Sequence, residues 1–306
     1  MQERVSIYQV NPVSNFPLDN FAVIERAVRE ASEGGSSLCV LPEDCLLGVV
    51  RGNQPLLEAG SRFDEWVVRL SRLAKMHSID LVPGSLPKTV GESVYNTTLY
   101  INSHGVVVSE YSKNNLWLSE RDEYDQSTME PVVFDGVLGR TALLICWDIM
   151  DHTLFESVVR KGVEWIIIPS FWVNAQAQSL QKKRGKAKGV YRDFIEGHML
   201  DSLIATRAQE YNVGIVFCNF GGTKPYVDIF GQAVKARSAG KSQIIAPLGG
   251  LNSRLNTSGV GHLDVEINRG YIRTVLNDHE VLYGRREDVS SGQQYIVKNE
   301  GQIAHI

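Results

Sequence analysis

Leu143-Leu144-Ile145-Cys146-Trp147-Asp148 is the stretch around which the rest of the chain is organised. The apolar, partly branched run over 141–145 predicts a buried strand that ends at Cys146. Apolar residues at helical spacing begin again at Leu154, which predicts a helix after a short polar segment. A cysteine in such a strand–turn–helix elbow lies where a nucleophile would be exposed, and N–H groups of a following helix would favour its thiolate. The alternative is that Cys146 is a small buried apolar residue.

Composition restricts the class of protein. The chain has 306 residues, of which 43% are hydrophobic and 22% charged, as in an ordinary globular protein. Its formal net charge of -4 and pI near 6.0 argue against a broad nucleic-acid-binding surface. No apolar run has the length of a signal peptide core or a membrane span, so we expect a soluble cytoplasmic protein with no membrane partner. The four cysteines form no CxxC pair, which gives no sign of zinc and suits a reducing compartment: Cys39, Cys45, Cys146 and Cys218.

Helices alternate with buried strands along the chain, which predicts one α/β domain over 1–288. A polar tail over 289–306 follows, and one place for it is an oligomer interface. We expect helices over 20–33, 56–77, 154–161 and 194–211, a hairpin over 226–236, and strands over 5–10, 38–41, 79–82, 94–101, 106–111, 132–134, 138–145, 163–168, 213–218, 243–246 and 260–267.

Two other reactive side chains come directly after expected strands. Glu43 follows the apolar run over 38–41 and Pro42, and Lys113 follows the strand expected over 106–111. In α/β folds the carboxyl ends of strands are where chemistry is placed. Taken singly, Glu43 is also explained as a solvated loop acid and Lys113 as a surface cation.

Together these residues carry a resemblance to a known family. The sequence resembles the nitrilase superfamily of carbon-nitrogen hydrolases, over most of its length to about Asp288. That family has a four-layer α-β-β-α sandwich, and its members usually form dimers, so we expect this fold and a homodimer or larger homo-oligomer. The matching pieces are Leu41-Pro42-Glu43, Tyr95-Asn96-Thr97, Tyr111-Ser112-Lys113-Asn114-Asn115-Leu116, Ile145-Cys146-Trp147-Asp148, Ile168-Pro169-Ser170, Arg207-Ala208-Gln209-Glu210-Tyr211-Asn212, Asn219 and Gly240-Lys241-Ser242-Gln243-Ile244 through Pro247 and Gly249.

The resemblance implies roles for the reactive residues. Cys146 would be the nucleophile, Glu43 the base, and Lys113 with the Trp147 N–H the donors to an oxyanion. A thioester would form and be hydrolysed, with no metal or organic cofactor. The family's second glutamate, which orients lysine and substrate, matches Glu120 best, with Glu123 as the alternative.

Other residues are assigned with alternatives. The resemblance makes Phe171 and Trp172 walls of the substrate pocket, and core packing is the other explanation. A dyad of Cys146 with His152 is the weaker alternative to the implied triad. Arg207 and Glu210 are expected to brace the structure.

Two departures from the family pattern lie near the expected pocket. The segment Ile149 to Thr153 is longer than the usual link between the cysteine and a helix glutamate, here Glu156, and an insertion separates Gly221 from Lys241. The basic run over 182–188 either meets an anion or is a solvated loop. These features leave the identity of the substrate open.

The expected reaction is hydrolysis of a small amide or N-carbamoyl compound that releases ammonia or an amine. Nitrilases of the superfamily carry Glu where this chain has Asp148, and carbamoylases that hold an amino-acid carboxylate carry Arg where it has Ile149-Met150. The alternatives are a nitrilase, a soluble amide acyltransferase on the same scaffold, and a non-enzymatic interaction module.

Overall fold

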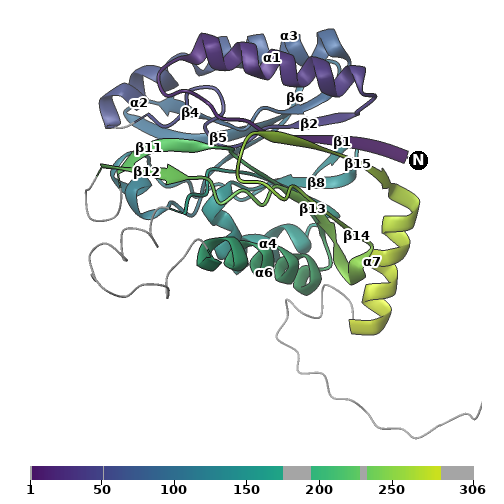
Figure 1. Cartoon of the computed structure of the whole chain (residues 1–306). Coiled ribbons are helices and arrows are strands. Elements are labelled where there is room, and N and C mark those ends of the chain that lie inside the picture. The colour runs from purple at the N-terminus through teal and green to yellow at the C-terminus, as the bar shows by residue number, and fades with distance from the viewer. Residues whose placement is uncertain (1, 51, 175–193, 228–232, 284–306) are drawn as a thin grey trace, which may run out of the picture.

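Two β-sheets lie face to face with helices on both outer sides (Figure 1). The computed structural model describes residues 2–50, 52–174, 194–227 and 233–283. Within them the first sheet has seven strands: β1 (Gln2–Gln9), β2 (Leu38–Val40), β3 (Asp80–Val82), β4 (Ser85–Val90), β5 (Ser93–Ile101), β6 (Val107–Ser112) and β15 (Gly261–Asn268). The second has six: β7 (Phe134–Gly136), β8 (Gly139–Leu143), β9 (Trp165–Ser170), β10 (Gly214–Asn219), β13 (Gln243–Ala246) and β14 (Leu251–Arg254).

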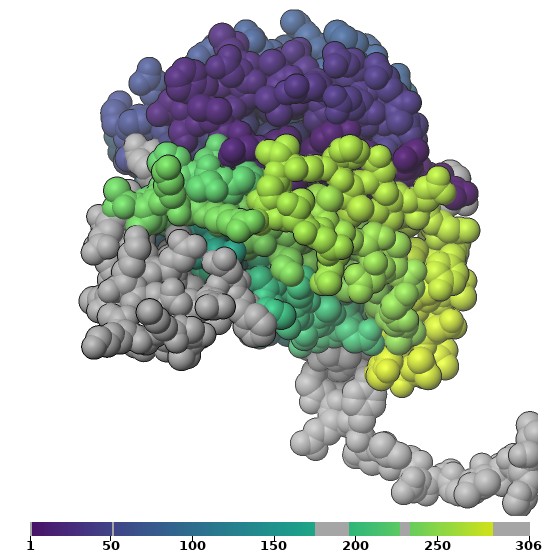
Figure 2. Space-filling model, in the orientation of Figure 1, coloured from purple at the N-terminus to yellow at the C-terminus, as the bar shows by residue number. Residues whose placement is uncertain are grey.

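The helices form the two outer layers. In Figure 1, α1 and α3 cover the first sheet and α4 and α6 cover the second, while α7 runs along one side of the molecule. Figure 2 shows the same order on the surface, with the N-terminal layer in purple at one end and α7 in yellow at the side. The helices are α1 (Pro17–Glu33), α2 (Asn53–Gly60), α3 (Phe63–His77), α4 (His152–Val159), α6 (Phe194–Tyr211) and α7 (Arg269–Tyr283), with short 3₁₀ helices η1 (Leu118–Asp122), η2 (Cys146–Met150) and η3 (Pro247–Gly249).

Parallel strands occupy the centre of each sheet. The first sheet has the order β15-β1-β2-β3-β5-β4, with β6 also paired to β5, and β1, β2 and β3 are parallel. The second has the order β14-β13-β10-β9-β8-β7, and β8, β9 and β10 are parallel. The carboxyl ends of β2 and β8 therefore present the segments that follow them at the edge of their sheets.

Successive side chains of a central strand point to opposite faces of its sheet, so they belong to different layers of the core. Leu38 and Val40 of β2 belong to the core between the sheets, whereas Cys39 and the next residue after the strand, Leu41, belong to the core beneath α1 and α3. All four side chains have no exposed surface. Fully burying an aliphatic side chain contributes roughly 1.5–3 kcal/mol, so both faces of this strand stabilise the packing. The four-layer α-β-β-α sandwich is confirmed.

The sequence-based prediction of one helix over 56–77 is wrong. The structure has α2 and α3, separated at Ser61 and Arg62. Gly60 ends α2 directly against β4, where a Cβ atom would lie 2.4 Å from Thr89 Oγ1. This space admits only glycine at position 60, at the point where α2 ends.

Other boundaries also differ from the prediction. The turn expected at Asp135-Gly136 lies at 137–138, because Gly136 pairs with Gly139 across the β7–β8 hairpin. Gly139 has φ +114°, a conformation that favours glycine. Strands β4 and β14 and helix α7 were not predicted. The expected domain end at 288 and the tail over 289–306 lie outside the described residues.

A hairpin outside both sheets forms in the segment where an insertion was expected. Strands β11 (Thr223–Val227) and β12 (Ala233–Arg237) pair antiparallel as a separate two-stranded sheet. The hairpin predicted over 226–236 is thus present with a longer first strand. In the part of the chain that the structure describes, we find no helix long and apolar enough to cross a membrane.

Candidate active site

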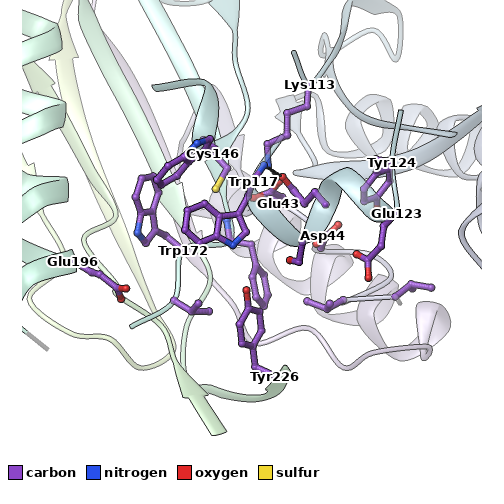
Figure 3. Close-up of a pocket in the computed structure, with 17 residues that line it drawn as sticks. Glu43, Asp44, Lys113, Trp117, Glu123, Tyr124, Cys146, Trp172, Glu196 and Tyr226 are labelled. Atoms are coloured by element: carbon purple, nitrogen blue, oxygen red, sulfur yellow. Dashed lines mark hydrogen bonds and ion pairs between the residues drawn. The ribbon is translucent and has the colours of Figure 1, made fainter. Parts of the chain in front are cut away.

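Cys146 lies at a strained turn between the second sheet and η2. The strand ends at Leu143, and Cys146 is the first residue of η2 with a left-handed φ of +46°. A non-glycine residue in this region costs about 1–2 kcal/mol, so surrounding contacts must impose the conformation. The turn directs the sulfur into a pocket beside Lys113 (Figure 3).

Asp148 holds this turn in place. Its Oδ2 accepts hydrogen bonds from the Ile145 N–H at 2.9 Å and from the Tyr111 hydroxyl at 2.9 Å, and its Oδ1 accepts from the Asn115 N–H at 2.7 Å. The side chain is fully buried, and burial raises its pKa to about 7. Tyr111 and Asn115 flank Lys113 in sequence, so one carboxyl group fixes the turn of Cys146 relative to the segment that carries the lysine.

Lys113 lies between two glutamates. Its Nζ is 2.8 Å from Glu43 Oε1 and 2.7 Å from Glu120 Oε1, and its side chain is 1% exposed. Burial alone would lower the pKa of the ammonium, but the charges of Glu120 and Glu43 outweigh it and hold the pKa well above its usual value. Lys113 therefore remains a fixed positive charge at the base of the pocket.

The carboxylate of Glu43 is held at both oxygens. Oε1 accepts from Asn96 Nδ2 at 2.8 Å in addition to Lys113, and Oε2 accepts from the Phe171 N–H at 2.7 Å. Its side chain is 2% exposed. Glu43 follows β2 in the first sheet and Phe171 follows β9 in the second, so this contact joins the two sheets at the site.

Glu120 is fixed by its own short helix. Its Oε2 accepts from the Trp117 N–H at 2.6 Å at the start of η1, while Oε1 binds Lys113. Burial raises the pKa of Glu120, and Lys113 opposes that shift. The contact with Lys113 favours Glu120 over Glu123 as the second glutamate. Glu123 also lines the pocket.

The buried position of Cys146 favours the protonated thiol over the thiolate. Burial raises its pKa well above the usual value, Glu43 raises it further, and Lys113 opposes both. The expectation that a following helix would favour the thiolate is therefore wrong for the resting site: η2 has only five residues, and burial dominates. The proton must be removed by a nearby base during any reaction of the sulfur.

Aromatic side chains form much of the pocket wall. Trp147, Phe171 and Trp172, the residues expected there, all line it. Sequence reasoning missed Trp117 and Tyr226, which line it as well (Figure 3). Nothing local distinguishes these two aromatics from ordinary loop and strand residues. The other lining residues are Glu43, Asp44, Val49, Val50, Lys113, Ser119, Glu120, Glu123, Tyr124, Cys146, Val173 and Glu196.

Other candidates lie away from the pocket. The side chain of His152 is exposed at the start of α4, and His152 does not line the pocket, which disfavours a dyad with Cys146. Glu156 pairs with Arg160 at 3.8 Å and does not line the pocket either. The basic run over 182–188 lies outside the described residues.

Arg207 and Glu210 brace the structure, as expected. Arg207 Nε donates to the Ile149 carbonyl at 3.1 Å, and its guanidinium lies 2.7 Å from Glu210 Oε2. This contact supports the backbone at the end of η2, where the segment expected to be longer than in the family begins.

The three cysteines other than Cys146 are buried away from the pocket. Cys39, Cys45 and Cys218 are at most 1% exposed, and burial raises the pKa of each thiol. None of them lines the pocket. Among the described residues we find no group of three or more His, Cys, Asp and Glu side chains that could hold a metal ion.

Comparison with known proteins finds matches over the part of the chain that contains Glu43, Lys113 and Cys146. A family profile described as "Carbon-nitrogen hydrolase" matches residues 4–276. The solved structure of an amidase from Nesterenkonia sp. superposes with a TM-score of 0.68 at 23% identity, covering 89% of this chain and 92% of that one. A glutamate variant of that amidase carries the acetamide moiety of fluoroacetamide covalently on its active-site cysteine.

Curated relatives match shorter regions. Pantetheinase of Bos taurus is 30% identical over 185 residues, which is 51% of this chain and 36% of that protein. Deaminated glutathione amidase of Dictyostelium discoideum is 26% identical over 209 residues, which is 61% of this chain and 70% of that protein. The chain thus spans about a third of the length of the pantetheinases that it matches.

Proposed function

Because this chain belongs to the carbon-nitrogen hydrolase family, we propose that it hydrolyses the carbon–nitrogen bond of a small amide or N-carbamoyl compound. The observation that carries the proposal is the Lys113 ammonium, held between Glu43 and Glu120 beside Cys146 at a strained turn. The amidase names of the relatives support an amide over a nitrile.

The first chemical step is attack of the sulfur on the carbonyl carbon. Glu43 takes the proton from the Cys146 thiol as the S–C bond forms, and the carbonyl oxygen becomes an oxyanion. The Lys113 ammonium and the backbone N–H of Trp147 donate hydrogen bonds to that oxygen. Preorganised donors of this kind each contribute about 10²–10³ to the rate, because they do not have to reorient during the reaction.

The second step breaks the carbon–nitrogen bond. The oxyanion collapses, and the leaving nitrogen takes the proton from Glu43, so that ammonia or an amine departs and a Cys146 thioester remains. Glu43 then removes a proton from water, which attacks the thioester. The acid is released, and the thiol of Cys146 receives the proton that Glu43 removed from water. Glu43 thus accepts and returns the proton in both steps.

Glu120 acts in this scheme through Lys113. Its carboxylate stabilises the charged lysine against the penalty of burial and fixes the direction of the Nζ donor. Glu43 can then exchange protons with sulfur, nitrogen and water while Lys113 keeps its charge. The two glutamates thus have separate roles on either side of one cation.

A panel of compounds with one shared propyl group tests the reaction class. Butyramide and N-carbamoylpropylamine should release ammonia, butyronitrile should be poor, and Cys146→Ala should abolish release while retaining its circular dichroism spectrum. Product analysis with added alkylamines, scoring acid against N-alkylamide, separates hydrolysis from acyl transfer. A nitrile converted to acid as fast as its amide, or no release by folded wild-type protein from any amide in a broad library, would overturn the proposal.

A further inference from the structure

Three tryptophans form one continuous wall of the pocket. Trp147 lies between the other two, with ring centroids 4.3 Å from Trp117 and 4.9 Å from Trp172. They come from three separate segments: the start of η1, the turn after β8 and the loop after β9. Indole rings carry the largest apolar surface of any side chain, so this wall favours an apolar, flat group over water.

Hydrogen bonds hold the backbone that carries two of the three tryptophans. The Trp172 N–H donates to Asn219 Oδ1 at 2.8 Å, and its carbonyl accepts from Asn219 Nδ2 at 3.2 Å and from the Ala239 N–H at 2.8 Å. The Trp147 carbonyl accepts from Asn115 Nδ2 at 3.0 Å. A surface fixed before binding loses little conformational entropy when a ligand covers it, so its apolar area contributes to selectivity.

The β11–β12 hairpin adds a further wall. Tyr226 extends from β11 into the pocket and is 9% exposed (Figure 3). It packs with Val173, Phe220 and Ala236 in a small apolar cluster that joins the hairpin to the loop after β9. The hairpin occupies the segment between Gly221 and Lys241, where an insertion relative to the family is expected, so it is a candidate for a feature that sets specificity.

The described lining residues offer no unpaired cation to an anionic substrate. Lys113 is the one Lys or Arg among those lining residues, and it is already paired with Glu43 and Glu120. The other charged lining residues in the described part of the chain are acids: Asp44, Glu123 and Glu196. A carboxylate on the substrate would therefore have no unpaired Lys or Arg to bind among the described lining residues.

We propose that the preferred substrate carries an uncharged apolar chain on its carbonyl carbon, ending in an aromatic ring in the best case, and that Tyr226 helps to select it. The chain on the carbonyl stays bound to Cys146 through both chemical steps, so a wall beside Cys146 acts on that part of the substrate. This inference rests on the proposed hydrolysis.

A series of primary amides tests the inference. We expect kcat/KM for ammonia release to rise by about four-fold per methylene from acetamide to butyramide, or about 15-fold in total, and to be higher again for 3-phenylpropanamide. The anion glutaramate should react at least about ten-fold more slowly than its neutral isostere 5-methylhexanamide. A flat or falling series, or faster turnover of glutaramate, would overturn the inference.

Aldehydes test binding without turnover. An aldehyde adds to the Cys146 thiol by forming an S–C bond while the thiol proton passes to the aldehyde oxygen, and no leaving group is needed. Protection of Cys146 from iodoacetamide, mapped by mass spectrometry, should strengthen from acetaldehyde through butanal to 3-phenylpropanal. If it does and no amide is hydrolysed, the proposed hydrolysis fails alone; if amides react without chain preference and protection is equal, the inference fails alone.

Variants of the hairpin locate the selectivity. Tyr226→Ala should lower the ratio of kcat/KM for 3-phenylpropanamide to that for acetamide by about ten-fold, and Tyr226→Phe should restore it because the ring is kept. Lys235→Ala is the matched control, because Lys235 is exposed on β12 of the same hairpin. Tyr226→Leu, which keeps most of the apolar volume, replaces the alanine variant if that one unfolds. An unchanged ratio in a folded Tyr226 variant that lacks the ring would remove Tyr226 from the argument.

Discussion

Replacing Glu120 with glutamine isolates the charge that holds Lys113. Glutamine has the same shape, and its carbonyl oxygen can still accept the hydrogen bond that Glu120 Oε2 accepts from the Trp117 N–H at 2.6 Å. The position of Oε1, 2.7 Å from Lys113 Nζ, is then taken by an NH2 group, which carries no negative charge and cannot accept a hydrogen bond from the ammonium. The Glu120 side chain is 15% exposed, so solvent screens this change only weakly.

The magnitude follows from the distance. Unit charges 2.7 Å apart attract by about 6 kcal/mol at an effective dielectric constant near 20. Desolvation offsets part of that, and removing one partner of a buried ion pair costs about 3–5 kcal/mol. Lys113 retains Glu43, so we expect the loss to appear as misalignment of the oxyanion donor. Loss of one such donor lowers kcat by about 10²–10³.

The assay is steady-state ammonia release from butyramide, with circular dichroism and the thermal midpoint as checks on folding. Glu120→Gln should lower kcat by 10²–10³ with a folded protein, as for the loss of one oxyanion donor. Glu123→Gln, a matched change in another acid that lines the pocket, should be mild, at less than about five-fold. Reversed severities would move the role to Glu123, and no effect from either would refute the argument that Lys113 needs two carboxylates.

Three further outcomes can be checked. Cys146→Ala should lose turnover while Cys45→Ala and Cys218→Ala keep it, and iodoacetamide should label Cys146 first; preferential labelling of Cys45 in step with lost activity would contradict this. Burial raises the pKa of Asp148 to about 7, above the unfolded value near 3.9, so its proton stabilises the folded state at low pH and that stability is lost as pH rises through 7. In urea unfolding, the loss in free energy of unfolding caused by Asp148→Asn should therefore shrink by up to about 4 kcal/mol between pH 4 and pH 8. A loss that grows over this pH range would contradict a raised pKa of Asp148. Light scattering at micromolar concentration should give a mass at least twice 34.1 kDa, and a monomer would remove the expected dimer.

The reactive residues could be predicted because their signal is local. Glu43, Lys113 and Cys146 each come soon after a run of residues that predicts a strand, and in α/β folds the ends of strands are where reactive side chains gather. The choice of Glu120 over Glu123 needed the structure. It depends on the one-turn helix that begins at Trp117, whose residues have no helical periodicity.

The pocket walls and some boundaries could not be predicted because their causes are not local. In the sequence, Tyr226 has no feature that distinguishes it from other strand residues. Its place in the pocket depends on the packing of β11 against the loop after β9. The apolar periodicity of the 56–77 segment gives no sign of the break after Gly60, where β4 leaves no room for a Cβ atom. Helix α7 was missed, although Ile272, Val275 and Leu276 are buried at helical spacing.

Because the site residues are divided between the two sheets, activity depends on how the two sheets pack against each other. Glu43 and Lys113 follow strands of the first sheet, and Cys146 and Phe171 follow strands of the second. A small sliding of one layer over the other would leave every helix and strand intact, yet it would part the sulfur from its base. During refolding, catalysis should therefore return with or after inter-sheet packing, as the last property to be regained and the first to be lost on heating.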